Sequence, residues 1–259
     1  MAYADREGCL LHYEPTGDAG LPVLVLSNSL GSNLTMWEPQ LGALVPHFRL
    51  LRYDTRGHGK SSITPGPYTI EQLGRDVLCL LDVLEIDQSN FCGLSMGGLI
   101  GQWLAIHAAG RLQKLVLANT AAKIGTEEAW NTRIATVLRE GLTPVIPGTL
   151  ERWFTAEFRA ARPVVVASIQ AMLQSADPQD YAANCAAIRD ADFRTAPQAI
   201  HTPTLIIAGA HDPSTTLEDG KFLAENIAGS KYIELPTAHL SNVEAADSFN
   251  AALLSFLSH

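Results

Sequence analysis

The chain has 259 residues, of which 47% are apolar and 17% charged, and its formal net charge is −9. This length and apolar content predict a folded protein with a substantial core and exclude a disordered chain. The acidic balance argues against nucleic acid and anionic membranes as partners, because both bind clustered lysine and arginine. An anionic substrate would therefore need a local cationic group.

Short β-like runs alternate with helix-like runs along much of the chain. This alternation is typical of an α/β protein whose mostly parallel sheet is covered by helices on both faces. Periodicity and turn residues place the strands and the helices of this core. We expect strands at residues 10–14, 22–27, 49–54, 90–94, 114–118, 204–208 and 232–235, and helices at residues 70–84, 96–109, 217–228 and 243–257.

The alternation stops after Asn119 and resumes at Pro203. The sequence predicts a core domain from residues 1–120 and 196–259, and a helical cap or lid from residues 121–195 over the carboxyl edge of the sheet. Ligands of open α/β sheets bind at that edge. The alternative is that these helices only pack against the flank of the sheet. The cap helices are expected at residues 127–139, 150–158, 164–174 and 180–190.

Cysteine spacing and terminal composition carry little functional signal. No C-x-x-C pair occurs, which argues against a zinc site and a dense disulfide framework. Three of the cysteines lie in apolar or helix-like runs, which predicts small buried thiols; the four are Cys9, Cys79, Cys92 and Cys185. The first residues lack a cationic start followed by an apolar segment, and no stretch is apolar over the roughly 20 residues that span a bilayer. We expect a cytoplasmic protein.

A G-x-S-x-G pattern occupies residues 93–97, between an expected strand and an expected helix. In that context the pattern predicts a nucleophile elbow, in which a tight strained turn projects the serine above the sheet. Gly93 and Gly97 leave room for the turn, because a Cβ at either position would meet neighbouring main chain. Ser95 is therefore the candidate nucleophile.

A serine hydroxyl needs a base to take its proton and an acid to orient that base. Elbow hydrolases supply them in the order Ser, Asp or Glu, His. Asp212 follows the expected strand at residues 204–208, and His239 follows the one at residues 232–235. Ser95, Asp212 and His239 thus come in the right order, each at the end of a strand, and we predict that they form a catalytic triad.

Other polar residues fit these roles less well. His211 adjoins Asp212, so one element would supply both acid and base in the wrong order. His58 lies in a glycine-rich loop and is interpreted as part of a structural turn, and Asp54 as a residue that fixes this loop. The strand that follows the elbow ends at Asn119 rather than at an acid. The remaining histidines have no companion at metal-ligand spacing, so no metal is expected.

An oxyanion hole needs two main-chain N–H groups, one of them from the residue after the nucleophile. Here that residue is Met96. The second donor is expected in the turn-rich loop at residues 28–32, after the strand at residues 22–27. Leu30 is the candidate, and Ser29 is the alternative.

With these residues identified, the chain resembles the α/β hydrolases, and among them the 3-oxoadipate enol-lactonases of bacterial aromatic catabolism. The resemblance runs through nearly the whole chain, and no predicted catalytic position departs from it. The elbow and the D-x-R-G-H-G loop are common to many α/β hydrolases. Three other segments point to the subfamily: the loop at residues 28–31, the cap stretch at residues 130–134 and the segment at residues 239–242. The matching segments are residues 24–31, 51–59, 93–103, 119–124, 130–134 and 238–244.

The resemblance implies hydrolysis of 3-oxoadipate enol-lactone, a small cyclic ester with a carboxymethyl arm, in the β-ketoadipate pathway. His239 would deprotonate Ser95, which attacks the lactone carbonyl while the Leu30 and Met96 N–H groups hold the oxyanion. Asp212 would orient His239 and stabilise its charged form. Neither a metal nor an organic cofactor is required.

The substrate carboxylate needs a cationic partner. Arg133, in the expected cap, offers a fork that matches a carboxylate, and Trp130 and Trp153 could enclose a planar ring. The alternative is that Arg133 lies on a solvated helix face and Trp130 packs the cap onto the sheet.

The same triad also fits three other kinds of enzyme: a general carboxylesterase, a C–C-bond hydrolase and a cofactor-free perhydrolase. A haloalkane dehalogenase is disfavoured, because it needs a carboxylate in place of Ser95. A ligand-binding receptor on this fold is the non-enzymatic alternative. The sequence does not indicate an oligomeric state.

Overall fold

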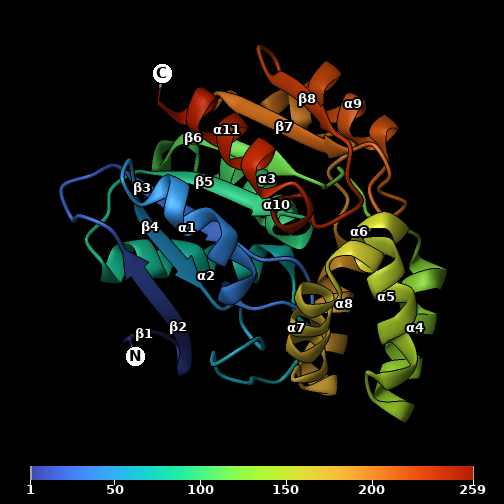
Figure 1. Cartoon of the computed structure of the whole chain (residues 1–259). Coiled ribbons are helices and arrows are strands. Elements are labelled where there is room, and N and C mark those ends of the chain that lie inside the picture. Colours follow the sequence, from blue (N-terminus) through green and yellow to red (C-terminus); the bar gives the residue numbers. More distant parts are fainter. Residues whose placement is uncertain (1, 259) are drawn as a thin grey trace.

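The computed structural model describes residues 2–258; Met1 and His259, which end the expected core ranges 1–120 and 196–259, lie outside the described residues. One eight-stranded sheet has the order β1-β2-β4-β3-β5-β6-β7-β8 (Figure 1). Strands β3 to β8 are parallel, and β2 pairs antiparallel with β1 and β4. The expected α/β class is confirmed. The strands are β1 (Ala2–Arg6), β2 (Cys9–Thr16), β3 (Val23–Ser27), β4 (Arg49–Tyr53), β5 (Ser89–Leu94), β6 (Leu112–Ala118), β7 (Thr204–Gly209) and β8 (Lys231–Leu235).

Strand β1 is absent from the strands expected from the sequence. It joins β2 through a tight turn at Glu7 and Gly8, whose φ angles are 53° and 84°. Positive φ at both central residues is typical of a two-residue hairpin turn that matches the twist of the strands. Only Ala4 of this strand is buried. It therefore lacks the apolar run that identifies the other strands.

Helices cover both faces of the sheet. Helices α2 and α3 pack against each other, and α1 and α11 pack together on the opposite face (Figure 1). The single helix expected over residues 243–257 is wrong, because the chain leaves helical geometry at Ala245, where φ is −129° and ψ is 54°. The helices are α1 (Glu38–Leu44), which the pattern does not predict, α2 (Ile70–Val83), α3 (Met96–His107), α9 (Leu217–Asn226), α10 (Ser241–Glu244) and α11 (Ala246–Leu257).

Five helices between β6 and β7 form a group beside the carboxyl ends of the parallel strands (Figure 1). The helix expected over residues 150–158 is wrong. Phe154 is extended, and the Thr155 side chain accepts from the Phe158 N–H to start a new helix. The helices are α4 (Glu127–Glu140), α5 (Ile146–Trp153), α6 (Ala156–Ala161), α7 (Pro163–Gln174) and α8 (Pro178–Asp190). These helices therefore lie where the sequence predicts a helical cap.

Two further expectations concern the core and the membrane. Cys9, Cys92 and Cys185 are buried free thiols, as expected, whereas Cys79 is partly exposed. Across residues 2–258, no helix combines the length and the apolar character needed to cross a membrane.

Candidate active site

Ser95 connects β5 to α3 with φ 58° and ψ −112°. A non-glycine residue rarely adopts this conformation, so the surrounding structure must hold it in place. A Cβ on Gly93 would collide with the main chain of Gly97, and a Cβ on Gly97 with the main chain of Ser27. The predicted need for glycine on both sides of the serine is therefore confirmed. Thr120 Oγ1 donates to the Ser95 carbonyl at 2.8 Å and supports the turn.

Asp212 and His239 lie on neighbouring loops, just beyond the carboxyl ends of β7 and β8. Nδ1 of His239 lies 2.7 Å from Oδ2 of Asp212, and both residues are buried. With Nδ1–H donating to this carboxylate, Nε2 is the ring nitrogen left to accept a proton. His239 and Ser95 line one cavity. The geometry thus suits a serine–histidine–aspartate triad.

Asp212 is held as a carboxylate by its hydrogen bonds. Oδ1 accepts the N–H groups of Ser214 at 2.8 Å and Thr215 at 3.1 Å, and Oδ2 accepts Thr215 Oγ1 at 2.7 Å. Burial alone would raise the pKa of this carboxyl group. The charge and hydrogen bond of His239, with the Thr215 and Asn119 hydrogen bonds, outweigh burial and lower the pKa of Asp212 below its ordinary value.

Asn119 is a supporting residue that the sequence analysis treated only as a position without an acid. Its Nδ2 donates to Asp212 Oδ2 at 3.0 Å and to the Ala238 carbonyl at 3.2 Å, and its Oδ1 accepts from Ser241 Oγ. One amide side chain thus connects the loops that carry the acid and the histidine. The available signal was its place directly after β6, at the carboxyl edge of the sheet.

The predicted oxyanion loop is a turn from Ser29 to Ser32. The Ser29 carbonyl accepts the Ser32 N–H at 3.2 Å, and Gly31 has φ 75°, which is typical of the third position of a type II turn. The Ser29 N–H lies 3.5 Å from Met36 Sδ. Within residues 2–258, no protein acceptor bonds the Leu30 or Met96 N–H. This difference favours Leu30 over Ser29 as the second donor.

The cavity above Ser95 has a volume of about 410 Å³. Its walls come from the oxyanion loop, the elbow, the His239 loop and the cap helices. All three predicted cap residues lie in this wall, together with Arg152, which the sequence analysis missed. The lining residues are Ser29, Leu30, Ser95, Ile124, Gly125, Ala129, Trp130, Arg133, Thr149, Arg152, Trp153, Tyr181, Ile188, Pro213, Ser214 and His239.

Two arginines approach the same hydroxyl group in this cavity. Thr149 Oγ1 accepts from Nη2 of Arg133 at 2.8 Å and from Nη2 of Arg152 at 3.2 Å. Neither guanidinium forms an ion pair with a carboxylate of residues 2–258. Burial, and then the charge of Arg133, lower the pKa of Arg152. An anion between these groups would relieve their mutual repulsion.

The two tryptophans of the cap differ in their surroundings. Trp130 Nε1 donates to the Ile124 carbonyl at 2.7 Å, and the Arg133 guanidinium lies 5.9 Å from the Trp130 ring centre. Trp153 is buried, and its carbonyl accepts the Leu240 N–H at 3.0 Å, beside His239. Both rings contribute apolar wall to a cavity that Arg133 and Arg152 also line.

The residues set aside in the sequence analysis lie outside this cavity. His211 is exposed. Asp54 accepts the N–H groups of Leu34 at 2.8 Å and Lys60 at 2.9 Å, so its expected loop-fixing role is confirmed. Among residues 2–258, no group of three or more histidine, cysteine, aspartate or glutamate side chains could hold a metal ion.

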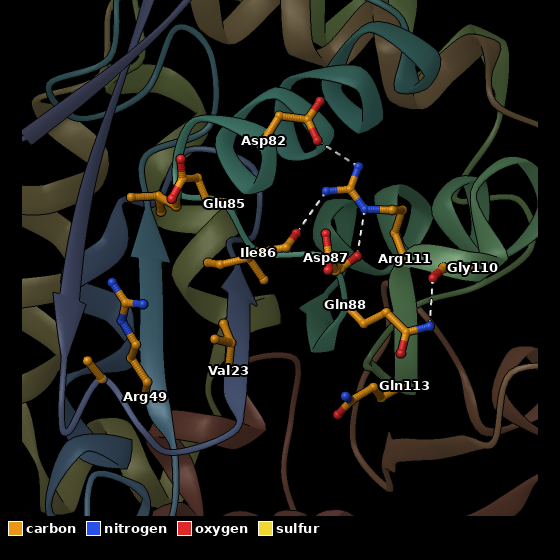
Figure 2. Close-up of a pocket in the computed structure, with 12 residues that line it drawn as sticks. Val23, Arg49, Asp82, Glu85, Ile86, Asp87, Gln88, Gly110, Arg111 and Gln113 are labelled. Carbon is orange, nitrogen blue, oxygen red and sulfur yellow. Dashed lines mark hydrogen bonds and ion pairs between the residues drawn. The ribbon is translucent and has the colours of Figure 1, made fainter.

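A larger cleft of about 910 Å³ lies elsewhere on the molecule (Figure 2). Val23 and Arg49 are the first residues of β3 and β4, so the cleft lies at the amino edge of the sheet, opposite the elbow. Figure 2 shows Arg111 bonded within it to Asp82 and to the carbonyls of Ile86 and Asp87. Arg111 is thus satisfied by its neighbours, and the residues that line this cleft include no nucleophile–base pair.

Comparisons with known proteins agree with this geometry. A family model described as the alpha/beta hydrolase fold matches residues 22–246. Two curated relatives from Acinetobacter baylyi are similar along almost their entire length. One, 3-oxoadipate enol-lactonase 2, is 47% identical over 94% of this chain and 91% of its own. The other, 3-oxoadipate enol-lactonase 1, is 40% identical over 95% and 92%.

Among solved structures, the enol-lactonase from Burkholderia xenovorans superposes with a TM-score of 0.98. It is 48% identical, and the match covers 100% of both chains. Together, the family model, the two curated relatives and this structure carry the same conclusion. The chain belongs to the α/β-hydrolase family, and within it to the group of the 3-oxoadipate enol-lactonases.

Proposed function

We propose that this protein hydrolyses 3-oxoadipate enol-lactone to 3-oxoadipate through a covalent intermediate on Ser95. The observation that carries the proposal is that one cavity is lined by both a nucleophile–base pair and two arginines. Ser95 and His239, which is paired with Asp212, line it together with Arg133 and Arg152, which have no acidic partner among the described residues. A small ester with a carboxylate arm suits both sets of residues, and enol-lactonases are close relatives of the chain.

In the first half of the reaction, Nε2 of His239 takes the proton of Ser95 Oγ as Oγ bonds to the lactone carbonyl carbon. The N–H groups of Leu30 and Met96 hold the resulting oxyanion. Collapse of this intermediate breaks the ring C–O bond, and the electron pair leaves on an enolate oxygen. An enolate is a better leaving group than a simple alkoxide, so proton donation by His239 matters less for breaking the ring bond. The departing enolate takes up the proton held by His239 and becomes an enol, which returns the imidazole to its neutral form.

In the second half, the opened chain stays attached to Ser95 as an acyl-enzyme. His239 takes a proton from water, whose oxygen bonds to the acyl carbon, and the Oγ–C bond then breaks with return of the proton to Ser95. The released enol becomes the ketone of 3-oxoadipate. Asp212 stabilises the imidazolium in both halves, because its pKa is held low by the hydrogen bonds described above. The mechanism uses no metal and no organic cofactor.

The cap recognises the carboxylate arm in this proposal. Arg133 and Arg152 bind it, with Thr149 fixing both guanidinium groups, and Trp130 and Trp153 enclose the ring. We assign residues 121–195 to this cap domain, and residues 1–120 and 196–259 to the core domain. We also expect a cytoplasmic enzyme.

The test follows the ultraviolet absorbance of freshly generated enol-lactone after addition of the purified protein. The wild type should accelerate its decay, and Ser95→Ala should return the decay to the uncatalysed rate. A Ser95→Ala protein with undiminished activity contradicts the serine mechanism. A wild type that hydrolyses a neutral activated ester but leaves the enol-lactone intact contradicts the substrate and favours a general carboxylesterase.

A further inference from the structure

We propose that His58 is a positioning residue for the reaction, because its neutral imidazole holds the turn that presents the Leu30 N–H to the oxyanion. The inference rests on the oxyanion role proposed above for Leu30. His58 is absent from the lining of the catalytic cavity among the described residues. It therefore acts through the loop and not on the substrate.

The contact that carries the inference joins His58 to the middle of the turn. The Gly31 N–H donates to Nε2 of His58 at 2.8 Å, while Nδ1 lies 3.3 Å from the Arg56 carbonyl oxygen. The Gly31 N–H can only donate, so Nε2 is the acceptor, and in the neutral ring Nδ1 then carries the proton toward the Arg56 carbonyl. Asn184 Nδ2 also lies 3.4 Å from Nδ1, but its shorter bond is the one it donates to the Arg56 carbonyl at 3.1 Å. The imidazole thus connects two loops, and it can do so only in its neutral form.

The turn has a second fixed point, one peptide earlier. The Ser29 carbonyl accepts the Ser32 Oγ–H at 2.7 Å in addition to the Ser32 N–H. In a trans peptide the N–H points away from the carbonyl oxygen, so this pair of bonds directs the Leu30 N–H to the other side. With the Ser29 carbonyl held by Ser32 and the Gly31 N–H held by His58, Leu30 N–H is the donor of the turn that remains for a ligand.

Two cap helices, α7 and α8, pack against the same turn. A Cβ on Gly31 would lie 2.6 Å from Leu173 Cδ1 and 2.9 Å from Tyr181 Cε2, on helices α7 and α8. Asn184, also on α8, donates to the Arg56 carbonyl at 3.1 Å. The turn is thus held between the cap and the loop of His58. Loss of the Gly31–His58 bond would leave a buried N–H unpaired, so the turn must move to satisfy it.

The surroundings of His58 keep it neutral near pH 7. Burial lowers the pKa of His58, and this effect outweighs the Arg56 carbonyl and the Asp54 carboxylate, which both act to raise it. On α8, Asp180 packs against the adjoining Gly57, and burial raises the pKa of its carboxyl group despite the hydrogen bond from Tyr68. Protonation of His58 would set an N–H on Nε2 against the Gly31 N–H.

The first test compares His58→Leu with His58→Gln. The Gln side-chain oxygen can take the place of Nε2 as an acceptor, whereas Leu cannot accept a hydrogen bond. His58→Leu should lower kcat by about 100-fold with little change in KM, the loss typical of one oxyanion donor. His58→Gln should stay within about fivefold of the wild type, because the accepting atom is restored. Equal losses in both variants, or an unchanged kcat in His58→Leu, overturn the proposal.

The second test uses the acid side of the pH profile and needs no apolar variant. In the wild type, His239 and His58 must both be neutral, so log(kcat/KM) should fall with a slope approaching 2 at pH values below both pKa values. His58→Gln has lost one of these groups and should fall with a slope of 1. Circular dichroism at each pH restricts the comparison to folded protein. A slope of 1 in both proteins overturns the role of His58 protonation.

Both tests are run with the enol-lactone and with p-nitrophenyl acetate, a neutral activated ester that needs the same oxyanion donors. If the lactone is not a substrate but the ester is, the His58 result is read from the ester alone. The proposed substrate and the proposed role of His58 can therefore fail separately.

Discussion

Each proposed catalytic residue of the core lies in the loop or turn after a parallel strand, whereas Arg133 and Arg152 of the cap come from two helices, α4 and α5. The strand register brings the loops of Asp212 and His239 together, because β7 and β8 are neighbours in the sheet. Thr149 and Arg152 lie three residues apart on α5, and packing within the cap brings Arg133 of α4 to the same hydroxyl group. The reaction type is thus built into the sheet, and the choice of substrate depends on how the cap helices pack.

The two regions are nevertheless joined at the histidine loop. The His239 N–H donates to the Arg152 carbonyl at 3.3 Å. Glu244 accepts the Ala238 N–H at 2.8 Å through one oxygen and the Thr155 N–H at 3.1 Å through the other. The end of α5, which carries one of the two arginines, is therefore attached to the loop that carries the base. A substrate held by the arginines lies in a fixed relation to His239.

The largest loss of activity is expected from the core. Asp212→Asn keeps the shape of the side chain but removes the charge that stabilises the imidazolium and selects its tautomer, so kcat should fall by about 10⁴-fold. Steady-state kinetics on both the enol-lactone and a neutral ester measures the loss. Because Asp212 acts in the chemical step and not in substrate recognition, kcat should fall by a similar factor for both substrates. A loss confined to the anionic lactone would place Asp212 in substrate recognition.

The elbow should be intolerant of a single methyl group. Gly93→Ala forces a Cβ into the main chain of Gly97 and should destabilise the fold by about 4 kcal/mol. Denaturant unfolding followed by circular dichroism gives the free energy of unfolding. Gly110→Ala is the matched control, because a Cβ there has nothing within 4 Å. A similar free energy of unfolding in the two variants would show that the main chain of the elbow can shift to make room for a Cβ. Close packing would then not explain the glycine at position 93.

A smaller and selective effect is expected from the cap. Arg133→Met and Arg152→Met should each lower kcat/KM for the anionic lactone by about 100-fold, because each removes a charge-assisted bond to the carboxylate. Activity on a neutral ester should change by less than about threefold, since that ester makes no such bond. Arg139→Met is the control, because Arg139 is exposed at the end of α4. Equal losses on both substrates would remove the arginines from carboxylate recognition.

The difference between the core and the cap also explains which site residues the sequence could predict. The positions of Ser95, Asp212 and His239 at strand ends follow from local patterns, because the order of parallel strands brings their carboxyl ends to one edge. Arg152 was not recognised, because the expected helix began at residue 150, whereas α5 begins at Ile146 and places Thr149 and Arg152 three residues apart on one helix. Which side of a short helix faces a cavity depends on packing, and no periodic pattern records it.

His58 shows a second kind of limit. The glycine-rich motif predicts a turn, and the structure has one, since Gly57 and Gly59 have φ of 72° and 54°. The partner of His58, however, is the Gly31 N–H, 27 residues away in the chain. Almost every residue type has a main-chain N–H, so the sequence does not show which residue donates to His58. It indicated a structural histidine but not the turn that this histidine supports.

The central claim, that Ser95 opens an anionic lactone through an acyl-enzyme, is tested most directly by mass spectrometry of enzyme quenched in acid during turnover. Ring opening leaves the departing oxygen attached to the acyl group. The peptide containing Ser95 should therefore gain the entire mass of the enol-lactone, whereas Ser95→Ala should neither gain it nor consume the lactone. Attachment of this mass to a different residue, or turnover by Ser95→Ala at the wild-type rate, would contradict the claim.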